Sequence, residues 1–221
     1  MSSVSPASFP TAAASAGSAA SPATRMPAAE RRVLILDIAR TVFGRRGYHG
    51  TTTDQIASAA GISQPYVVRM FGTKEKLFLE VLADTLDTLM AAFRTALDGA
   101  VARGEDEHGA ARAVGNAYLD LAATRGFHTL LLQAFVSGAD PAIGAAARAG
   151  FLEIYRFLVH DAGFTPERVH EFLGSGMLFS VLLGIEMPGL YDTDDDAAAL
   201  MQASFGDKCA AIVDFARTHA D

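Results

Sequence analysis

Four side chains in the segment from Gly47 to Leu77 could bind nucleic acid. They are the amide of Gln64, the phenol of Tyr66, the guanidinium of Arg69 and the ammonium of Lys74. Amide and guanidinium groups can make paired hydrogen bonds to base edges in the major groove, whereas a lysine ammonium neutralises phosphate. A short helix with such groups on its outer face suits insertion into the major groove of duplex DNA.

The start of a first short helix is marked by Thr52. Gln55 follows at the spacing of a capping box, in which the hydroxyl accepts from a first-turn amide and the glutamine reaches back. This pair predicts a helix over about residues 54–60. Gly61 can adopt a positive φ and so permits a sharp turn, and Ile62 would fill the angle between this helix and the next.

A second short helix is predicted over about residues 64–70, with Ser63 as its cap and Pro65 in its first turn. Three apolar residues with i, i+3, i+4 spacing are expected to face the core: Val67, Met70 and Phe71. The outward side of the helix would then carry Gln64, Pro65, Tyr66 and Arg69.

Longer helices flank this pair. An apolar stripe that begins near Glu30 and includes Phe43 predicts a helix, which we expect Gly44 and Gly47 to end. Thr73 is expected to cap a long helix that runs to about residue 97. Its first turn would bring Lys74 next to free backbone amides, a favourable place for a phosphate.

Glycine, proline and aspartate residues divide the rest of the chain into further segments. We expect helices near residues 107–124, 127–137, 141–161, 166–186 and 195–218. No segment shows the alternation expected of a strand. The predicted fold is all-α with about nine helices: a disordered tail over 1–26, a three-helix helix-turn-helix head over 27–72, and a helical body over 73–221.

Charge is distributed unevenly along the chain, whose net charge is −7. Nine basic and five acidic residues between Arg25 and Glu80 give that stretch +4, and residues 81–221 carry −11. Any affinity for phosphate is therefore concentrated in the head. Arg31, Arg32 and Arg45 are typical of a solvated helix face, which can still add salt-dependent affinity.

Composition also bounds the compartment and the chemistry. The single cysteine, Cys209, excludes an internal disulfide and favours a reducing interior. The first 24 residues carry no charge, so they lack the charged start of a secretory signal, and no later run approaches the roughly 18 apolar residues of a membrane span. We expect a cytoplasmic protein without membrane association, metal or cofactor.

The order of these motifs resembles the DNA-binding head of TetR-family regulators. The motifs are G-Y-x-x-T-T-x-x-x-I-A from Gly47, A-G-I-S from Ala60 and F-G-T-K-E-x-L from Phe71. The resemblance covers roughly residues 30–80 and is specific in order and spacing. The remainder of the chain is similar only in length and helical layout.

The resemblance implies two sets of DNA contacts. The backbone would be held by Tyr48, Thr52 and Lys74. The bases would be approached by Gln64, Pro65 and Tyr66. This chain departs from many relatives at Val68 and Met70, where tyrosines are common, so Tyr66 or Arg69 would supply the missing phenol's contact.

The body mixes aromatic and polar residues and has glycines inside its predicted helices, which leave room between side chains. TetR relatives have a ligand cavity there, so the resemblance implies a small hydrophobic effector. The candidate lining residues are Phe93, Asn116, Tyr118, Phe127, Gln133, Phe151 and Tyr155. Ordinary helical core is the alternative for each of them.

A homodimer is expected for two reasons. One short recognition helix reads too few bases for useful specificity. The small and apolar residues of 169–184 suit close helix packing, and the resemblance favours a two-fold interface made with the last helix. The expected function is a repressor that leaves a pseudo-palindromic operator when its effector binds.

Other classes of function stay open to different degrees. An enzyme is disfavoured because the sequence lacks a Gly-x-Ser-x-Gly elbow, a His-Glu-x-x-His motif, a phosphate-binding glycine loop and a Cys/His ligand cluster. A ligand-independent DNA-binding or architectural module is an alternative. Activation in place of repression is another, since the sequence does not place the operator relative to a promoter.

Overall fold

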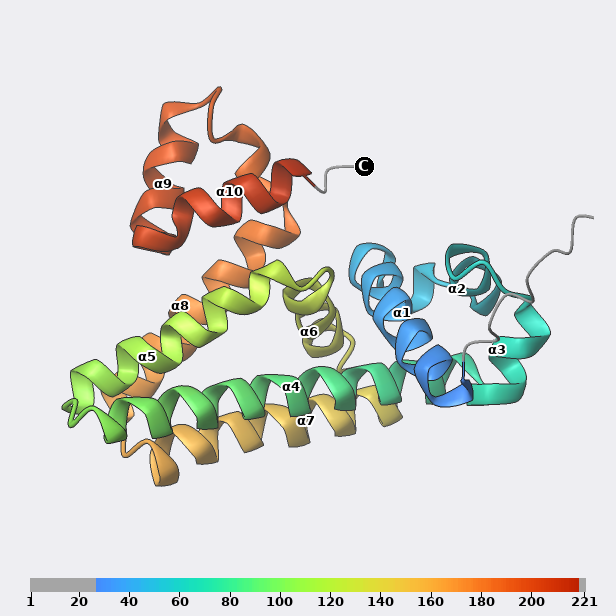
Figure 1. The fold of residues 1–221 in the computed structure, drawn as a ribbon, viewed down its shortest axis with the longest axis horizontal. Coiled ribbons are helices and arrows are strands. Elements are labelled where there is room, and N and C mark those ends of the chain that lie inside the picture. Colours follow the sequence, from blue (N-terminus) through green and yellow to red (C-terminus); the bar gives the residue numbers. More distant parts are fainter. Residues whose placement is uncertain (1–26, 219–221) are drawn as a thin grey trace, which may run out of the picture.

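The computed structural model describes residues 27–218, so the predicted disorder of residues 1–26 lies outside the described part of the chain. Within 27–218 all regular secondary structure is helical, which confirms the all-α prediction (Figure 1). The described residues form ten α-helices: α1 (Ala28–Gly50), α2 (Thr53–Ala59), α3 (Gln64–Phe71), α4 (Lys74–Ala102), α5 (Glu107–Asp120), α6 (Phe127–Val136), α7 (Pro141–Arg156), α8 (Pro166–Gly184), α9 (Asp195–Phe205) and α10 (Cys209–Thr218).

Helices α1, α2 and α3 form the head, at the right of Figure 1. Its apolar centre is made by fully buried side chains, namely Ile35, Phe43, Ile56 and Val67. The first turns of α4 complete this centre, because Phe43 packs edge-to-face on Phe78 with ring centroids 4.9 Å apart. The head therefore shares one continuous core with α4 to α8 of the body, which comprises α4 to α10.

Helix α1 ends differently from expectation. The expectation that Gly44 ends the helix is wrong, because Gly44 is helical and buried. A Cβ at this position would lie 2.5 Å from Thr129 Oγ1 and 3.0 Å from the carbonyl oxygen of Gly126, so glycine here permits the close approach of α6. The chain leaves helical geometry only at Gly47, where φ is 69°.

The body is arranged around α4. Helices α4 and α7 run along one edge of the molecule, and α5 and α8 cross above them (Figure 1). Helix α6 lies between these pairs and contacts α1 of the head, while α9 and α10 pack at the end of α8. A second, smaller core lies beneath α8, α9 and α10 and includes Phe179, Met201, Phe205 and Ile212.

Three boundaries differ from the sequence-based ranges. Helix α4 continues to Ala102, about a turn beyond its expected end. The helix expected over 141–161 changes at Phe157, where five residues continue as a π-turn. The segment expected to be one helix over 195–218 is divided at Gly206, whose φ of 50° is incompatible with a continuous α-helix.

Helix α6 is apolar on several sides. Phe127, Leu130 and Leu131 are buried in the main core. With the segment Pro141–Asp161 it forms a pair whose combined length and composition would suit a membrane, but the two are bent by 118°. Within the described residues, no single helix is long and apolar enough to cross a membrane.

Candidate nucleic-acid interface and interior cavity

The start of α2 is fixed by Thr52. Its Oγ1 accepts from the Gln55 amide at 3.2 Å, and the Gln55 Oε1 accepts from the Thr52 amide at 3.0 Å. The predicted capping box is confirmed. Gly61 has a φ of 64°, the left-handed conformation that the sharp turn requires.

The start of α3 is held by contacts other than the expected cap. Ser63 occupies the N-cap position, but its hydroxyl makes no capping hydrogen bond, so that prediction is wrong. The Ser63 carbonyl instead accepts from the Tyr66 and Val67 amides. The Gln64 amide Nε2 donates to Thr53 Oγ1 at 3.2 Å, which ties the first residue of α3 back to α2.

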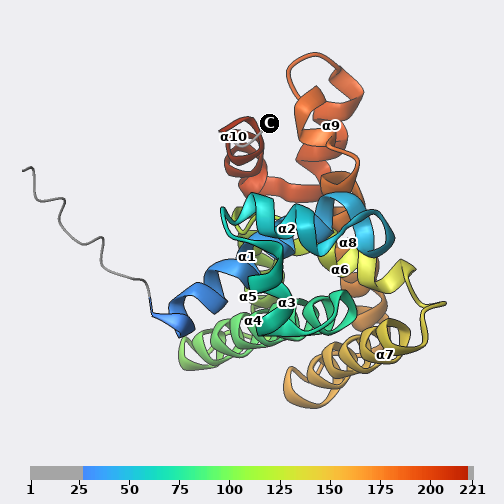
Figure 2. The same ribbon diagram turned by 90° about the vertical axis from the view of Figure 1, so that its right-hand side faces the viewer.

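Tyr66 lies between two arginine side chains. Arg31 Nη1 donates to the Tyr66 hydroxyl at 3.3 Å, and its guanidinium lies 5.4 Å from the ring centroid. The Arg69 guanidinium lies 4.9 Å from the same centroid. These contacts orient the phenol at the outer end of the head, where α2 and α3 face the viewer in Figure 2.

Lys74 and Tyr48 form a second contact between separate elements. The Lys74 ammonium lies 4.3 Å from the Tyr48 ring centroid and donates to the Tyr48 carbonyl at 2.9 Å. Burial, together with the carboxylates of Asp140 and Glu75, raises the pKa of Tyr48 above its usual value, so its hydroxyl keeps its proton. Thr73 caps α4 as expected, since its hydroxyl accepts from the Lys76 amide at 3.1 Å.

The C-terminal end of α3 is also braced by α1. Arg32 lies over the Phe71 ring at 4.7 Å and pairs with Glu80 of α4 at 2.5 Å. Sequence reasoning treats Arg31 and Arg32 as solvated, and no local signal marks their partners, which lie 35 and 48 residues away. Of the predicted DNA-binding residues, Gln64, Pro65, Tyr66 and Arg69 lie on α3. Thr52 and Lys74 lie at the starts of α2 and α4, and Tyr48 lies near the end of α1, under the Lys74 ammonium.

The head joins the body through a buried cation that sequence reasoning missed. The Arg40 side chain is 8% exposed, and its Nη2 lies 2.8 Å from Asp84 Oδ2 of α4 and 3.0 Å from Asp37 Oδ1. Its Nε donates to Thr85 Oγ1 at 3.3 Å. The one-helix pattern places Arg40 off the apolar stripe, and only the approach of α4 explains its burial.

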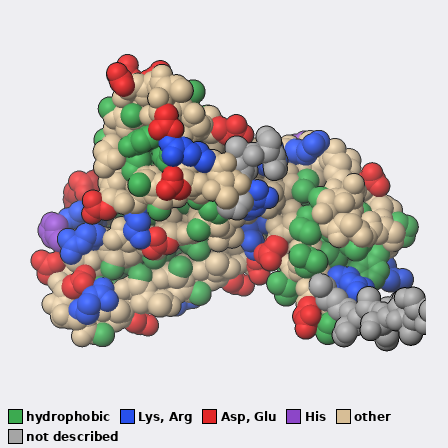
Figure 3. Space-filling view, turned by 45° about the horizontal axis from the view of Figure 1, so that its top comes forward, with side chains coloured by type: hydrophobic (Ala, Val, Ile, Leu, Met, Phe, Trp, Pro, Cys, Tyr) green, Lys and Arg blue, Asp and Glu red, His purple; other side chains and the backbone are tan. Residues whose placement is uncertain are grey.

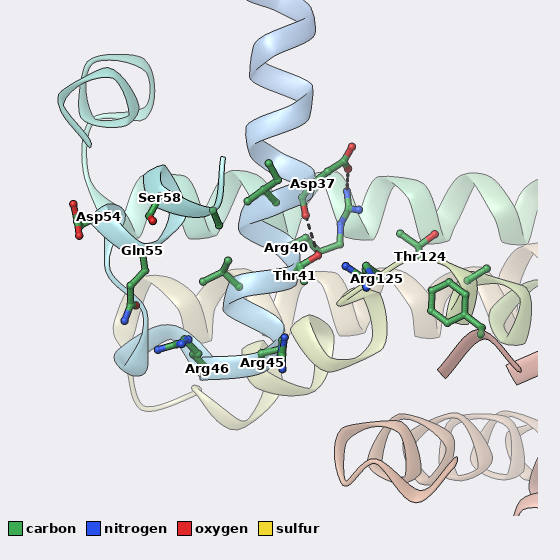
Figure 4. A pocket seen from close by; sticks show the side chains of 15 residues that line it. Asp37, Arg40, Thr41, Arg45, Arg46, Asp54, Gln55, Ser58, Thr124 and Arg125 are labelled. Carbon is green, nitrogen blue, oxygen red and sulfur yellow. Dashed lines mark hydrogen bonds and ion pairs between the residues drawn. The ribbon is translucent and has the colours of Figure 1, made fainter. Parts of the chain in front are cut away.

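A wide cleft separates the other side of the head from the body. Its volume is about 1260 Å³, and α1 and α2 form one wall while residues 123–125 and Phe215 form the other. Figure 4 shows that its labelled lining is polar, with Arg45 and Arg46 on the head side and Arg125 on the body side.

Acidic side chains are spread over the surface of the body in Figure 3.

The body contains an apolar interior cavity of about 40 Å³ between α4, α5, α6, α7 and α8. Three of the predicted ligand-binding residues line it together: Phe93, Tyr118 and Phe151. Further lining residues outside the predicted ligand-binding set include Leu131, Phe135, Phe172 and Met177. These four residues come from α6 and α8, and only the tertiary fold brings them together with the others.

The other four predicted ligand-binding residues lie elsewhere. Asn116 is exposed and lines a separate groove between α5 and α8. Phe127 is buried with its ring 5.3 Å from that of His128. Gln133 lies at the junction with the head, where its Oε1 is 2.8 Å from the position of a Cβ on Gly47. Tyr155 is 44% exposed.

His128 is a buried polar group that the sequence did not reveal. Neither of its ring nitrogens has a hydrogen-bond partner among the described residues. Burial lowers the pKa of His128 to about 3, so the imidazole is neutral near pH 7. Its ring lies against Tyr118, at 4.5 Å between centroids, and Tyr118 in turn shares a 2.8 Å hydrogen bond with Ser180.

An exposed apolar stripe runs along α8. It consists of Leu178, Val181 and Ile185, and Leu200 of α9 is also exposed. By contrast, Phe205 and Ile212 are buried within the chain's own second core. The stripe is the apolar surface that the predicted dimer would use.

The head matches known proteins. Residues 35–81 match the family model described as "Bacterial regulatory proteins, tetR family". The HTH-type transcriptional activator FasR of Mycolicibacterium smegmatis is 42% identical over 73 residues, which are 33% of each chain. The HTH-type transcriptional repressor KstR2 of Rhodococcus jostii is 42% identical over 64 residues, 29% of this chain and 31% of that one. The chain thus matches about a third of the length of these curated relatives.

Similarity to solved structures extends over the body. A TetR-like transcriptional regulator from Rhodococcus sp. RHA1 superposes with a TM-score of 0.55 at 22% identity, covering 87% of this chain and 97% of that one. A tetR-family transcriptional regulator from Streptomyces coelicolor gives a TM-score of 0.51 at 22% identity, covering 87% and 90%. At these identities the likeness concerns the fold alone.

Proposed function

We propose that the chain, whose residues 35–81 match the tetR family of bacterial regulatory proteins, is a homodimeric transcription repressor that leaves a pseudo-palindromic operator when a small apolar molecule binds its body. The observation that carries the DNA-binding part is the outer end of the head. There Gln64, Tyr66 and Arg69 lie on one short helix, beside the Lys74 ammonium at the start of α4.

The head residues take two roles in this proposal. Base edges in the major groove are approached by Gln64, Pro65 and Tyr66, and Arg69 lies farther along the same helix. Tyr48, Thr52 and Lys74 hold phosphates, because a hydroxyl at a helix start and an ammonium suit backbone contacts. In the free protein Gln64 and Lys74 make the intramolecular hydrogen bonds described above, so DNA would exchange those partners for bases and phosphates.

The dimer is proposed to form through the exposed stripe of α8. Leu178, Val181 and Ile185 form an apolar surface that a two-fold axis would pair with its copy. Pairing two heads in this way doubles the number of bases read, and the half-sites would lie about one helical turn apart or slightly more.

We propose that ligand binding in the body is transmitted to the head through α6, which leads to release of the DNA. Leu131 and Phe135 of α6 line the interior cavity, while Gly126 and Thr129 at its start touch α1 at Gly44. A ligand larger than the 40 Å³ cavity must displace its walls. A shift of α6 would then move α1, because the two helices are in close contact at Gly44. The wide cleft beside the head gives it room to turn.

We propose repression because KstR2 of three organisms is described as a repressor. Activation is the alternative, because FasR is described as an activator. A ligand-independent DNA-binding module is the second candidate, and the small volume of the interior cavity is the observation that favours it.

Selection of binding sites from random duplex DNA with the full chain tests the proposal. An inverted repeat with half-sites about one turn apart is expected. Enrichment of no sequence, or of a single unrepeated half-site, would contradict the dimeric operator reader.

A further inference from the structure

A groove of about 390 Å³ opens between α5 and α8, next to the interior cavity. This volume lies in the range of small-molecule sites, about 300–1,000 Å³. Its apolar lining includes Tyr118, Phe172 and Phe179. Arg112 and Arg168 line it as well, so two cations and an aromatic surface share one hollow.

The two arginines differ in their present partners. Arg168 Nη2 lies 2.9 Å from His108 Nε2, and its Nη1 lies 3.6 Å from Glu171. Arg112 makes no hydrogen bond or ion pair with any described residue. The pKa of Asp106 is lowered chiefly by its hydrogen bond from the Gly109 amide, and the positive charge of Arg112 adds to this effect. Asp106 itself accepts from the Gly109 amide at 2.9 Å as the cap of α5. A guanidinium without a direct partner in a groove favours an anionic ligand.

Two glycines shape this groove: Gly115 leaves space in it, and Gly176 lets Tyr118 pack closely on α8. A Cβ on Gly115 of α5 would meet no atom nearer than Phe172 Cε2 at 3.9 Å, and one on Gly176 of α8 would lie 3.3 Å from Tyr118 Cε1. Glycine inside a helix is about fivefold less favourable than alanine in the helix equilibrium. Packing does not require glycine at position 115, so its effect there is to leave space above Phe172.

Tyr118 forms a shared wall between the groove and the interior cavity. Its side chain lines both, as do Phe172 and Gly176. Behind the Tyr118 ring lies His128, whose nitrogens lack partners among the described residues. A ligand in the groove therefore touches the residue that packs on α6, the helix that contacts the head.

The groove stays open in the proposed dimer. Each residue turns an α-helix by about 100°, so the groove positions 172, 175, 176 and 179 of α8 share one side. The exposed stripe at 178, 181 and 185 lies toward the opposite side. A partner on the stripe would leave the groove accessible.

We infer that the α5–α8 groove binds an amphipathic anion, with its carboxylate or phosphate held by Arg112 and Arg168 and its apolar chain lying over Phe172 and Phe179. This inference rests on the proposed function, since it makes that anion the effector. It assigns the effector an anionic end, which an interior cavity lined only by apolar groups and Tyr118 does not provide.

Titration calorimetry of the full chain with dodecanoate, dodecyl phosphate and dodecanol, each kept below its micelle concentration, tests the inference. Dodecanoate or dodecyl phosphate should bind, and whichever binds more tightly identifies the head group. Dodecanol should bind at least about tenfold more weakly, since it lacks the charge-assisted hydrogen bonds. Equal affinity for dodecanol, or binding of none of the three, would overturn the inference.

Variants locate the site. Arg112→Gln should weaken dodecanoate binding about tenfold and leave dodecanol binding unchanged, because the side chain is exposed and its loss removes only the charge. Gly115→Leu should weaken both ligands by filling the groove, with circular dichroism to verify folding. Arg156→Gln, an exposed arginine on α7 outside the groove, is the matched control. An Arg112→Gln affinity equal to that of Arg156→Gln would overturn the assignment.

Operator binding with and without dodecanoate separates this inference from the proposed function. If dodecanoate binds through Arg112 but does not change DNA affinity, the groove is an anion site and the release proposal fails. If the operator is bound with sequence preference but no amphipathic anion binds, the DNA-reading function stands and the groove inference fails.

Discussion

Arg31 donates to the Tyr66 hydroxyl at 3.3 Å, although the two residues lie 35 positions apart and on different helices. Because the Arg69 guanidinium flanks the same ring, Tyr66 is held in place before DNA arrives. A preoriented side chain loses less conformational entropy on binding than a free one. The contact therefore links the first helix of the head to the specificity of the third.

We predict that Arg31→Ala lowers operator affinity about fivefold, since a hydrogen bond and a cation–π contact at a partly exposed site are worth about 1 kcal/mol. The loss should be largest for the half-site base that Tyr66 approaches. Fluorescence anisotropy on operators changed at single bases measures it. Tyr66→Phe, which keeps the ring but loses the hydroxyl, should cost less, and an equal loss on every operator would show that Arg31 acts only as a charge.

Because α2 has a side-chain cap and α3 has none, we predict different losses of stability when their N-cap residues are replaced. Thr52→Ala should lower the free energy of unfolding by about 1 kcal/mol, because the reciprocal capping hydrogen bonds are lost. Ser63→Ala should have a much smaller effect, because its hydroxyl makes no capping bond. Urea denaturation of the two variants is the measurement. Equal losses would mean that the cap assignments are wrong.

The ion pair of Arg40 with Asp84 is expected to stabilise the junction between the head and α4. Arg40→Met should lower the free energy of unfolding by about 1–2 kcal/mol, below the value for a fully buried pair because Asp84 is 44% exposed. The control is Arg94→Met in α4, the helix that carries Asp84, since the 3.6 Å pair of Arg94 with Glu153 has both side chains about half exposed. Its loss should fall within about 0.5 kcal/mol of zero. If Arg94→Met lowered the free energy of unfolding as much as Arg40→Met, burial of Arg40 would not explain its contribution to stability.

His128 predicts a dependence of stability on pH. Its pKa is about 3 in the folded protein and near 6.5 when unfolded, so between these values the unfolded chain binds more protons. Stability should therefore fall by about 2 kcal/mol between pH 7.5 and pH 5 on account of this group alone. His128→Phe should remove that part of the loss, whereas the exposed His160→Gln should retain it. Parallel pH profiles for wild type and His128→Phe would exclude the buried neutral imidazole.

Local chemistry made the head predictable. The Thr52 and Gln55 capping box, the positive φ of Gly61 and the cap by Thr73 depend on residues within a few positions, and each is as expected. The exceptions have longer-range causes. Gly44 is helical because α6 approaches it, and α6 begins more than eighty residues later.

The body was less predictable because its features depend on how helices meet. Arg40 belongs to a solvated face by its spacing in α1, yet the approach of Asp84 and Thr85 buries it. Phe93, Tyr118 and Phe151 meet at the interior cavity, whereas Asn116, Gln133 and Tyr155 point to three other places. Aromatic content alone does not tell which side of a helix meets which neighbour.

The central claim is that α3 reads bases and the start of α4 holds phosphate. It is tested most directly by the binding of Gln64→Ala, Tyr66→Phe and Lys74→Ala variants to a selected operator and to its single-base variants across a range of salt concentrations. Arg94→Ala, farther along α4, controls for the loss of one positive charge. The first two variants should change the preferred bases, and Lys74→Ala should weaken all sequences similarly while reducing the salt slope by about one. A uniform loss from all three, with unchanged base preference, would contradict the account.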